Sequence, residues 1–270
     1  MHRYTFIDGE ITVSEKSRIS VADRGLTLGD GLFETIRVSD GKAVNVRAHY
    51  ARLSASLELL AIKTNRTQKD FEAELDLVIE KNNLVQGSLR YTVTRGVAER
   101  GLAHPTSGKP TVIVTAGSAP AAGDAISCLI SGMLKVNEHS PLTQVKVLNY
   151  AEKIFALNDA KGRGFDDAIL LNTSDRVVGA TTANLFIRRG SEVMTPALAD
   201  GCLPGTVRSA VVAELDVAET CLVTQDVIAA EELVLTNALS VRAAKQVNNT
   251  GLIGKGVLYE RVFDVFESLS

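Results

Sequence analysis

The chain has 270 residues, 45% of them hydrophobic and 23% charged, which is typical of a globular protein long enough to bury a core. Its net charge of -3 does not favour nucleic acid or an anionic membrane as a partner, and no stretch approaches the roughly 20 apolar residues of a membrane span. Cys128, Cys202 and Cys221 lack CxxC spacing, the four histidines lack metal-ligand spacing, and the first residues lack the apolar run of a signal peptide. We therefore expect a cytoplasmic protein with reduced thiols and no metal site.

The first 115 residues alternate between strand-like and helix-like patterns separated by turn signals. In chain order we expect a hairpin of Tyr4–Ile7 and Ile11–Val13 about Asp8-Gly9, a glycine-punctuated loop at 25–31, a hairpin of Phe33–Val38 and Ala43–Val46, helices over Ala48–Leu60 and after Thr67, and strands over Ser88–Thr94 and Thr111–Thr115. This mixture predicts an α+β domain over residues 1–115.

The stretch 116–123 consists of small residues without periodicity, and we expect it to be a linker. Beyond it we expect strands over Ala125–Ser131, Ala168–Leu171, Leu185–Arg189, Val193–Thr195, Leu233–Thr236 and Val241–Val247, and helices over Tyr150–Lys161, Thr206–Leu215 and Val257–Leu269. Frequent short strands with few helices predict a second α+β domain over residues 124–270, with a barrel-like or mixed sheet.

Lys146 stands where a polar, proline-containing loop leads into a helix. Asn149 is a good N-cap for that amphipathic helix, which has Ile154, Phe155 and Leu157 as apolar residues. The apolar neighbours of Lys146 disfavour a charged amine, and a neutral lysine is a nucleophile toward carbonyls. The pattern therefore indicates a Schiff-base lysine, the alternative being a solvated lysine at the end of a strand.

Three groups of residues could bind an anion. Gly205 and Thr206 open a helix, where free N–H groups and the positive end of the helix dipole attract negative charge, unless they form only an ordinary cap. Thr236 and Asn237 end an apolar strand and could do the same, or they could simply form a turn. Arg52 lies on a predicted helix and could reach a phosphate or stay solvated.

Charged residues in the first domain suggest a second recognition site. Arg95 and Arg100 flank glycines that let the backbone bend, so that an arginine fork could clamp a carboxylate; the alternative is a surface loop. Glu34, on a predicted strand, would be costly to bury without a partner.

Short motifs occur in a fixed order along almost the whole chain. They are Phe6-Ile7-Asp8-Gly9, Asp23-Arg24-Gly25, Gly29 to Arg37, His49 with Arg52-Leu53, Thr94-Arg95-Gly96 with Arg100-Gly101, Lys146 with Asn149-Tyr150, Ala183 to Phe186, Leu203 to Arg208, and Thr236 to Leu239. No single motif is decisive, but the ordered set resembles the class IV pyridoxal-phosphate enzymes of fold type IV. That family includes branched-chain aminotransferases, D-amino acid aminotransferases and 4-amino-4-deoxychorismate lyases.

The resemblance implies a role for each matching residue. Lys146 would hold pyridoxal 5'-phosphate covalently and then move protons at the substrate Cα. The cofactor phosphate would be bound by Arg52 from one side and from the other by Gly205, Thr206, Thr236 and Asn237. Tyr150 would lie near the phenolic oxygen, Arg100 would hold a substrate carboxylate, and Phe33 and Arg95 would also belong to the substrate site. The resemblance further implies a cofactor between two α+β domains, and a homodimer.

One position departs from the family. A glutamate normally pairs with the pyridine nitrogen of the cofactor, and an ungapped alignment puts Gly179 in its place. A carboxylate there keeps the nitrogen protonated and makes the ring an electron sink. We hypothesise that the hydroxyl of Thr181 or Thr182, or a water, contacts the nitrogen instead.

The resemblance leaves the reaction open between related alternatives. Asn237-Ala238-Leu239, the motif around Phe33 and the short length favour 4-amino-4-deoxychorismate lyase, which releases pyruvate and leaves 4-aminobenzoate for folate biosynthesis. The runner-up is an aminotransferase acting on D-amino acids or branched-chain amino acids. A cofactor-binding protein without activity is a third reading, suggested only by Gly179.

Overall fold

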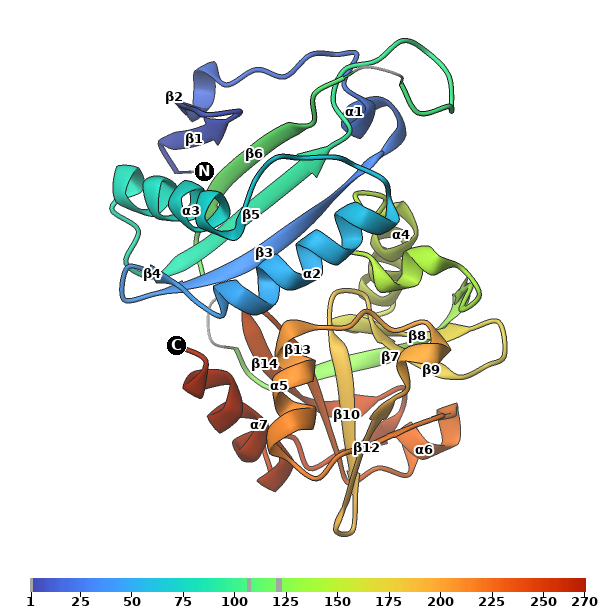
Figure 1. Ribbon diagram of the computed structural model, residues 1–270. Helices are drawn as coiled ribbons and strands as arrows, with labels where there is room; N and C mark the ends of the chain where they lie inside the picture. Colours follow the sequence, from blue (N-terminus) through green and yellow to red (C-terminus); the bar gives the residue numbers. More distant parts are fainter. Residues whose placement is uncertain (1, 106–107, 120–122) are drawn as a thin grey trace. The chain divides into compact units, whose positions relative to one another are not determined.

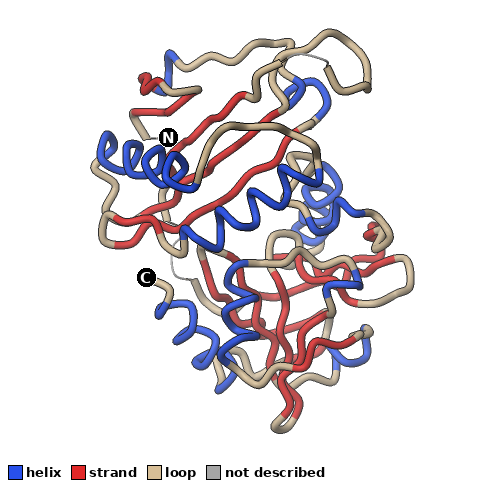
Figure 2. Tube along the Cα trace, viewed as in Figure 1, coloured by secondary structure: helices blue, strands red, loops and turns tan. Residues whose placement is uncertain are grey.

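The computed structural model of the protein describes residues 2–105, 108–119 and 123–270, which form two compact units (Figure 1). Unit 1 comprises the described residues within 1–120 together with Val145–Asn149, and unit 2 comprises those within 121–144 together with Tyr150–Ser270. The expected boundaries, 1–115 and 124–270, place Val145–Asn149 in the second domain. The contacts of this segment place it in unit 1 instead. Both units combine helices and strands, as Figure 2 shows.

Unit 1 is built on a six-stranded antiparallel sheet in the order β2-β1-β6-β5-β3-β4. Its strands are β1 (Tyr4–Ile7), β2 (Glu10–Val13), β3 (Gly31–Ser39), β4 (Lys42–Ala43), β5 (Gly87–Thr94) and β6 (Thr111–Gly117). Asp8 and Gly9 both have positive φ, as a two-residue hairpin turn requires. Strand β6 continues to Gly117, so the first residues of the expected linker are strand, and residues 120–122 of that linker lie outside the described residues.

Two helices cover one face of this sheet, α2 (Val46–Leu59) and α3 (Gln68–Asn82) (Figure 1). Thr67 begins α3 with a capping box: its hydroxyl accepts from the Asp70 N–H at 3.3 Å, and the Asp70 carboxylate accepts from the Thr67 N–H at 2.8 Å. Strand β3 has period two, so Leu32 and Ile36 enter the core under the helices while Phe33 faces the other way.

The glycine-rich stretch at 25–31 is not a plain loop. It contains the short helix α1 (Arg24–Leu28), whose first turn is capped by Asp23 through a 2.7 Å bond from the Gly25 N–H. The second oxygen of Asp23 accepts from the hydroxyls of Thr94 and Thr111, so a long-range contact that sequence periodicity does not reveal fixes α1. A 3-10 turn, η1 (Ser14–Lys16), precedes it.

Unit 2 is built on a nine-stranded mixed sheet in the order β12-β11-β10-β13-β14-β7-β8-β9, with β15 paired to β14. The strands are β7 (Ile126–Val136), β8 (Asp167–Asn172), β9 (Val177–Ala180), β10 (Asn184–Arg189), β11 (Glu192–Pro196), β12 (Ala218–Thr220), β13 (Glu232–Asn237), β14 (Ser240–Val247) and β15 (Thr250–Gly251). The sheet curves, since β9 and β10 contact each other although they are not neighbours in this order, and the Ala180 N–H at the end of β9 donates to the Ala183 carbonyl just before β10. This curvature agrees with the expected barrel-like sheet.

The helices of unit 2 are α4 (Ala151–Gly162), α5 (Thr206–Glu214), α6 (Thr224–Ile228) and α7 (Val257–Ser268), with 3-10 turns η2 (Pro141–Gln144) and η3 (Leu198–Asp200). The helix α4 differs from the expectation in two ways. Tyr150, not Asn149, is its N-cap, and its buried residues are Ala156 and Ala160, whereas Ile154 and Phe155 are 56% and 57% exposed. Within the described part of the chain, no helix is both long and apolar enough to cross a membrane.

Candidate active site

Lys146 lies on an extended segment that pairs with β3 in unit 1. The Phe33 N–H donates to the Lys146 carbonyl at 2.9 Å, and the Leu148 N–H donates to the Gly31 carbonyl at 3.1 Å. Leu32 and Val147 form the antiparallel β-bridge between these two bonds. Lys146 is therefore held by backbone hydrogen bonds on the sheet rather than at the tip of a loop.

Two basic side chains lie close to the ring of Phe33. Lys146 Nζ is 4.4 Å from the ring centroid, and Arg90 Cζ is 3.5 Å from it. The face of an aromatic ring attracts a cation, so a protonated amine at this position is stabilised by a cation–π interaction as well as by apolar contact with the ring. Arg90 was missed by sequence reasoning, although strand alternation puts it on the pleat opposite to the buried Leu89 and Tyr91.

Arg52 shares a buried carboxylate with His49. Glu34 accepts from Arg52 Nε at 2.9 Å and Nη2 at 2.6 Å, and its Oε2 lies 2.7 Å from His49 Nδ1. Burial alone would raise the pKa of Glu34, but the charge of Arg52 and the hydrogen bonds of His49 and Arg52 lower it to about 2. Glu34 thus has the partners that its burial requires, and it orients the Arg52 fork.

The two arginines expected to bind a carboxylate lie in different surroundings. Arg95 is buried, and it donates to Asp30 and to the carbonyls of Leu60 and Ala61. These internal bonds favour a structural part for Arg95 over the expected contact with substrate. Arg100 is exposed at the tip of the loop that follows β5.

In unit 2, Gly205 begins α5 without a side-chain cap. A Cβ on Gly205 would lie 2.0 Å from Asn184 Oδ1, so only glycine leaves room for this asparagine. Asn184 Nδ2 in turn donates to the Leu203 carbonyl at 2.8 Å. The asparagine therefore holds the turn before α5, where the first N–H groups of the helix and the buried Thr206 come together.

Thr236 pairs with Asn184 across β10 and β13. Its side-chain oxygen is buried and has no hydrogen-bond partner among the described residues. A buried hydroxyl without a partner is costly, and an anion at the start of α5 would give it one. Together with Gly205, this orphaned hydroxyl fits a phosphate group. The neighbouring Asn237 side chain accepts from the N–H groups of Leu239 and Ser240 and so forms a tight turn.

The position expected to carry a glutamate cannot easily carry any side chain. Gly179 has φ +153°, and a Cβ there would lie 2.8 Å from the Ala183 carbonyl oxygen. Thr181, the hydroxyl proposed as a substitute, is buried and lies 2.6 Å from Asp167 Oδ1. Because that hydroxyl is already bonded to Asp167, the exposed Thr182 is the better placed of the two threonines.

Tyr150 lies at the start of α4, with Lys153 Nζ 4.8 Å from its ring centroid. Burial lowers the pKa of Lys153. Cys128, Cys202 and Cys221 form no disulfide in the structure, and Cys128 and Cys202 are buried.

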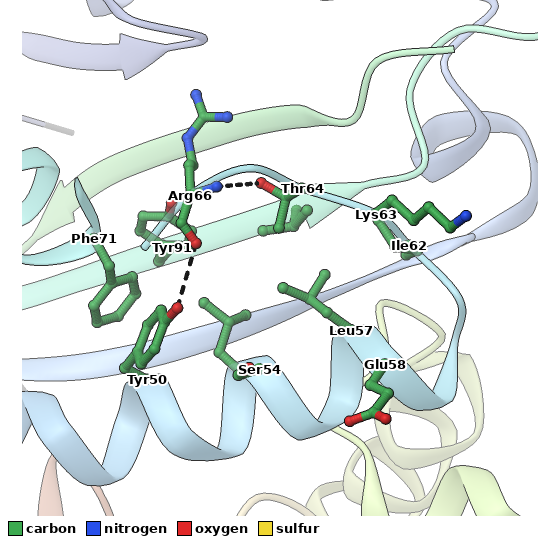
Figure 3. A pocket seen from close by; sticks show the side chains of 12 residues that line it. Tyr50, Ser54, Leu57, Glu58, Ile62, Lys63, Thr64, Arg66, Phe71 and Tyr91 are labelled. Carbon is green, nitrogen blue, oxygen red and sulfur yellow. Dashed lines mark hydrogen bonds between the residues drawn. The ribbon is translucent and has the colours of Figure 1, made fainter. Parts of the chain in front are cut away.

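A cavity of about 300 Å³ lies in unit 1 on the α2 side of the sheet, opposite to the face that carries Phe33 (Figure 3). Its lining includes Leu53, Phe71 and Tyr91. The Tyr91 hydroxyl and Arg66 Nε both donate to the carboxylate of Glu74, so these polar groups satisfy one another's hydrogen bonds inside unit 1. None of the residues expected in the active site lines this cavity.

Comparison with known proteins defines the family. The model of the class IV aminotransferases matches residues 31–247. A provisionally named branched-chain-amino-acid aminotransferase of Methanocaldococcus jannaschii is 32% identical over 241 residues, which cover 86% of this chain and 83% of that protein. The D-alanine aminotransferase of Staphylococcus epidermidis is 35% identical over 109 residues, 40% of this chain and 39% of that protein.

Solved structures agree with this assignment. A provisionally named 4-amino-4-deoxychorismate lyase from Legionella pneumophila is 28% identical, with a TM-score of 0.90 over 95% of this chain and 97% of that one. The Escherichia coli branched-chain aminotransferase has a TM-score of 0.93 over 100% of this chain and 95% of that one, and at 22% identity it supports the fold.

The chain belongs to the class IV aminotransferase family. It is an enzyme of fold type IV, and the enzymes of this family use pyridoxal 5'-phosphate.

Proposed function

We propose that the protein is a pyridoxal-phosphate lyase that releases pyruvate from 4-amino-4-deoxychorismate and leaves 4-aminobenzoate. The observation that carries the cofactor assignment is Lys146 itself, fixed by the backbone of β3 with its amine over the ring of Phe33. Such a lysine is positioned to react with an aldehyde and to exchange protons with a bound substrate. The bound cofactor supplies an electron sink for the carbon that carries the substrate amine.

Each unit contributes part of the proposed chemistry. In unit 2, Thr236, Thr206 and the N–H groups after Gly205 hold the cofactor phosphate, and Asn237 and Tyr150 flank the cofactor. In unit 1, the guanidinium of Arg52 is held by Glu34. We propose that it also binds the cofactor phosphate. Lys146 removes the proton from the carbon that bears the substrate amine. It then returns a proton to the methylene carbon of the departing enol-pyruvyl group as the carbon–oxygen bond breaks.

Gly179 supports a lyase over an aminotransferase. Its backbone conformation leaves no room for a side chain, so the carboxylate that usually pairs with the pyridine nitrogen is missing from this position. A lyase does not carry the amino group on the cofactor between two half-reactions, and we propose that it is therefore the reaction less affected by the missing carboxylate. The turn formed by Asn237 is the second support, since Asn237-Ala238-Leu239 resembles the lyases.

An aminotransferase is the second candidate, because the Methanocaldococcus jannaschii relative carries that name and matches most of the chain. The two reactions leave different products. We expect the purified, cofactor-loaded protein to convert 4-amino-4-deoxychorismate into equal amounts of pyruvate and 4-aminobenzoate. Amino transfer from leucine or D-alanine to 2-oxoglutarate, without release of pyruvate from 4-amino-4-deoxychorismate, would establish the second candidate instead.

A further inference from the structure

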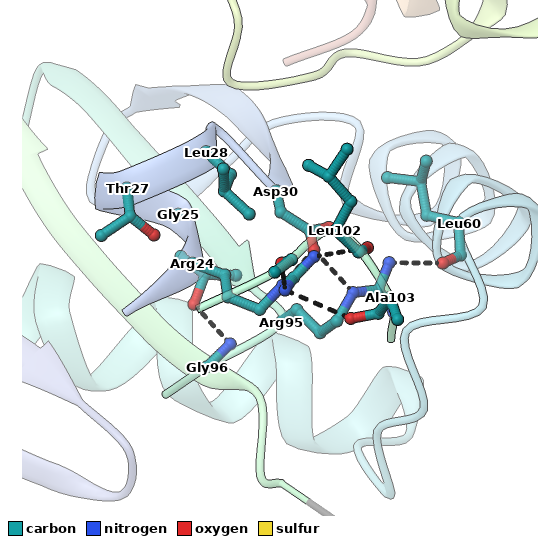
Figure 4. Close-up of polar contacts among 12 residues, drawn as sticks. Arg24, Gly25, Thr27, Leu28, Asp30, Leu60, Arg95, Gly96, Leu102 and Ala103 are labelled. Carbon is teal, nitrogen blue, oxygen red and sulfur yellow. Dashed lines mark hydrogen bonds and ion pairs between the residues drawn. The ribbon is translucent and has the colours of Figure 1, made fainter. Parts of the chain in front are cut away.

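Two buried arginines share one carboxylate oxygen in unit 1. Arg24 Nε and Arg95 Nε donate to Asp30 Oδ2 at 2.7 and 2.8 Å, as Figure 4 shows. Burial alone would raise the pKa of Asp30, but the hydrogen bonds and charges of Arg95 and Arg24 outweigh it and lower that pKa. The cluster of Arg24, Asp30 and Arg95 is therefore charged and has defined geometry.

The remaining nitrogens of both arginines bind backbone carbonyls. Arg24 Nη1 donates to Gly101 at 2.8 Å and to Ala103 at 3.3 Å, and its Nη2 donates to Leu102 at 3.2 Å. One guanidinium thus holds three consecutive carbonyls of the loop after β5 (Figure 4). Arg95 holds the end of α2 in the same way, through the carbonyls of residues 60 and 61. Charge-assisted bonds from a planar fork fix direction as well as distance.

The near end of the same loop is held by neighbours of Arg24. The Arg24 N–H donates to the Gly96 carbonyl at 2.9 Å, and the Ala98 N–H donates to the Ala22 carbonyl at 3.4 Å. Between them, Asp23 and Val97 form an isolated antiparallel β-bridge. Residues 22–24 therefore form hydrogen bonds with the loop on both sides of its tip.

Arg100 stands at that tip, exposed, directly before Gly101. Gly101 has φ +135°, which favours glycine, and because glycine is conformationally permissive the chain needs contacts with other residues to hold one direction there. The bond from Arg24 Nη1 to the Gly101 carbonyl is such a contact.

We propose that the Arg24–Asp30–Arg95 cluster is a positioning device that sets the placement of Arg100 and thereby the binding of a carboxylate on the substrate. This inference rests on the proposed function and on the part that the family resemblance implies for Arg100, which is to hold that carboxylate. Arg24 acts through the loop and does not touch the substrate.

The first test follows the loop directly. Trypsin cleaves after arginine, so the rate at which a fragment ending at Arg100 forms reports how often the loop opens. We expect Arg24→Gln to raise this rate by about tenfold or more, because the population of the open loop increases. Arg18→Gln is the matched control, since exposed Arg18 also donates to backbone carbonyls, but to those of Glu15 and Ser17 and not to the loop. An unchanged cleavage rate in Arg24→Gln overturns the inference.

The second test separates positioning from general damage by steady-state kinetics of pyruvate release from 4-amino-4-deoxychorismate. We expect Arg24→Gln to raise KM by about tenfold or more with a smaller change in kcat, because misplacement of a binding group weakens substrate binding. In an Arg100→Ala background the same substitution should have no further effect on KM. An unchanged KM in Arg24→Gln, or an effect that adds in full to that of Arg100→Ala, overturns the inference.

Two further controls complete the design. If Arg24→Gln does not fold, Arg24→Lys keeps the charge but not the three-carbonyl fork, and the same loosening of the loop and rise in KM are expected. If the wild-type protein releases no pyruvate, the proposed function fails. The cleavage result then decides by itself whether Arg24 holds the loop.

Discussion

The backbone N–H of Phe33 donates to the carbonyl oxygen of Lys146 at 2.9 Å, and the ring of the same phenylalanine lies 4.4 Å from the lysine amine. One residue of β3 thus fixes both the backbone and the side chain of the lysine. A lysine side chain loses much rotamer freedom when it is held, so an aromatic surface beside it lowers the cost of presenting the amine in one direction.

The first prediction concerns pH. The pKa of Glu34 is about 2 in the folded protein and 4.5 for an ordinary glutamate, so its carboxylate stabilises the fold above pH 4.5 and this stabilisation is lost as the pH falls toward 2. At pH 7 we expect Glu34→Gln to lower the free energy of unfolding by about 3 kcal/mol, because Arg52 and His49 lose their buried partner. The variant then unfolds at a lower denaturant concentration. Urea titrations at pH 7 and pH 3 measure this, and the difference between wild type and variant should shrink at pH 3. A constant difference would contradict the assignment.

The second prediction concerns Thr236. Replacing it with valine removes a buried hydroxyl that has no partner among the described residues. We expect the cofactor-free Thr236→Val protein to be as stable as wild type or more stable by up to about 1 kcal/mol, and to bind pyridoxal 5'-phosphate about tenfold more weakly. Thermal unfolding without cofactor and a cofactor titration measure the two effects. Loss of stability together with unchanged binding would rule out a phosphate contact.

The third prediction uses two glycines with different surroundings. In Gly205→Ala the new methyl group displaces Asn184 and disturbs the turn before α5, so we expect binding of pyridoxal 5'-phosphate to weaken by about tenfold or more. Gly162→Ala is the matched control, because it lies in α4 with nothing within 4 Å of the added Cβ. Equal cofactor affinity in both variants would remove Gly205 from the phosphate site.

The fourth prediction tests why Gly179 is a glycine. A side chain at φ +153° would be strained and would meet the Ala183 carbonyl, so we expect Gly179→Ala to lose about 1–3 kcal/mol of stability. Gly179→Glu should lose at least as much, and it should not behave as a simple restoration of the missing carboxylate. Chemical denaturation measures both variants, and a neutral Gly179→Ala would show that the position accepts a side chain.

Local signals predicted a large part of the fold. The Asp8-Gly9 turn correctly predicted the first hairpin, and Thr67, with Asp70 three residues on, marked the start of α3. In each case the controlling interactions lie within a few residues. The helix α1 was missed although its cap, Asp23, is local; the threonines that hold the other oxygen of Asp23 lie far along the chain. The exposed Ile154 and Phe155 were not foreseen, since an apolar residue on a helix does not by itself reveal what covers it.

The predicted site rests on the ordered motifs rather than on spacing. Lys146 by itself is an ordinary lysine in sequence, and only its pairing with β3 shows how it is held. Arg95 was assigned to the substrate because a sequence does not show that Asp30, 65 positions earlier, binds it. The partner of a charged group is a property of the fold, and so the roles of individual arginines emerged only from their contacts.

The central claim is that Lys146 carries the cofactor, and the visible absorption spectrum of the purified protein with pyridoxal 5'-phosphate tests it most directly. We expect a yellow protein whose colour is lost on reduction with borohydride, with the label mapping to the peptide that contains Lys146. A protein that the cofactor cannot colour, or a label on another lysine such as Lys153, would contradict the claim.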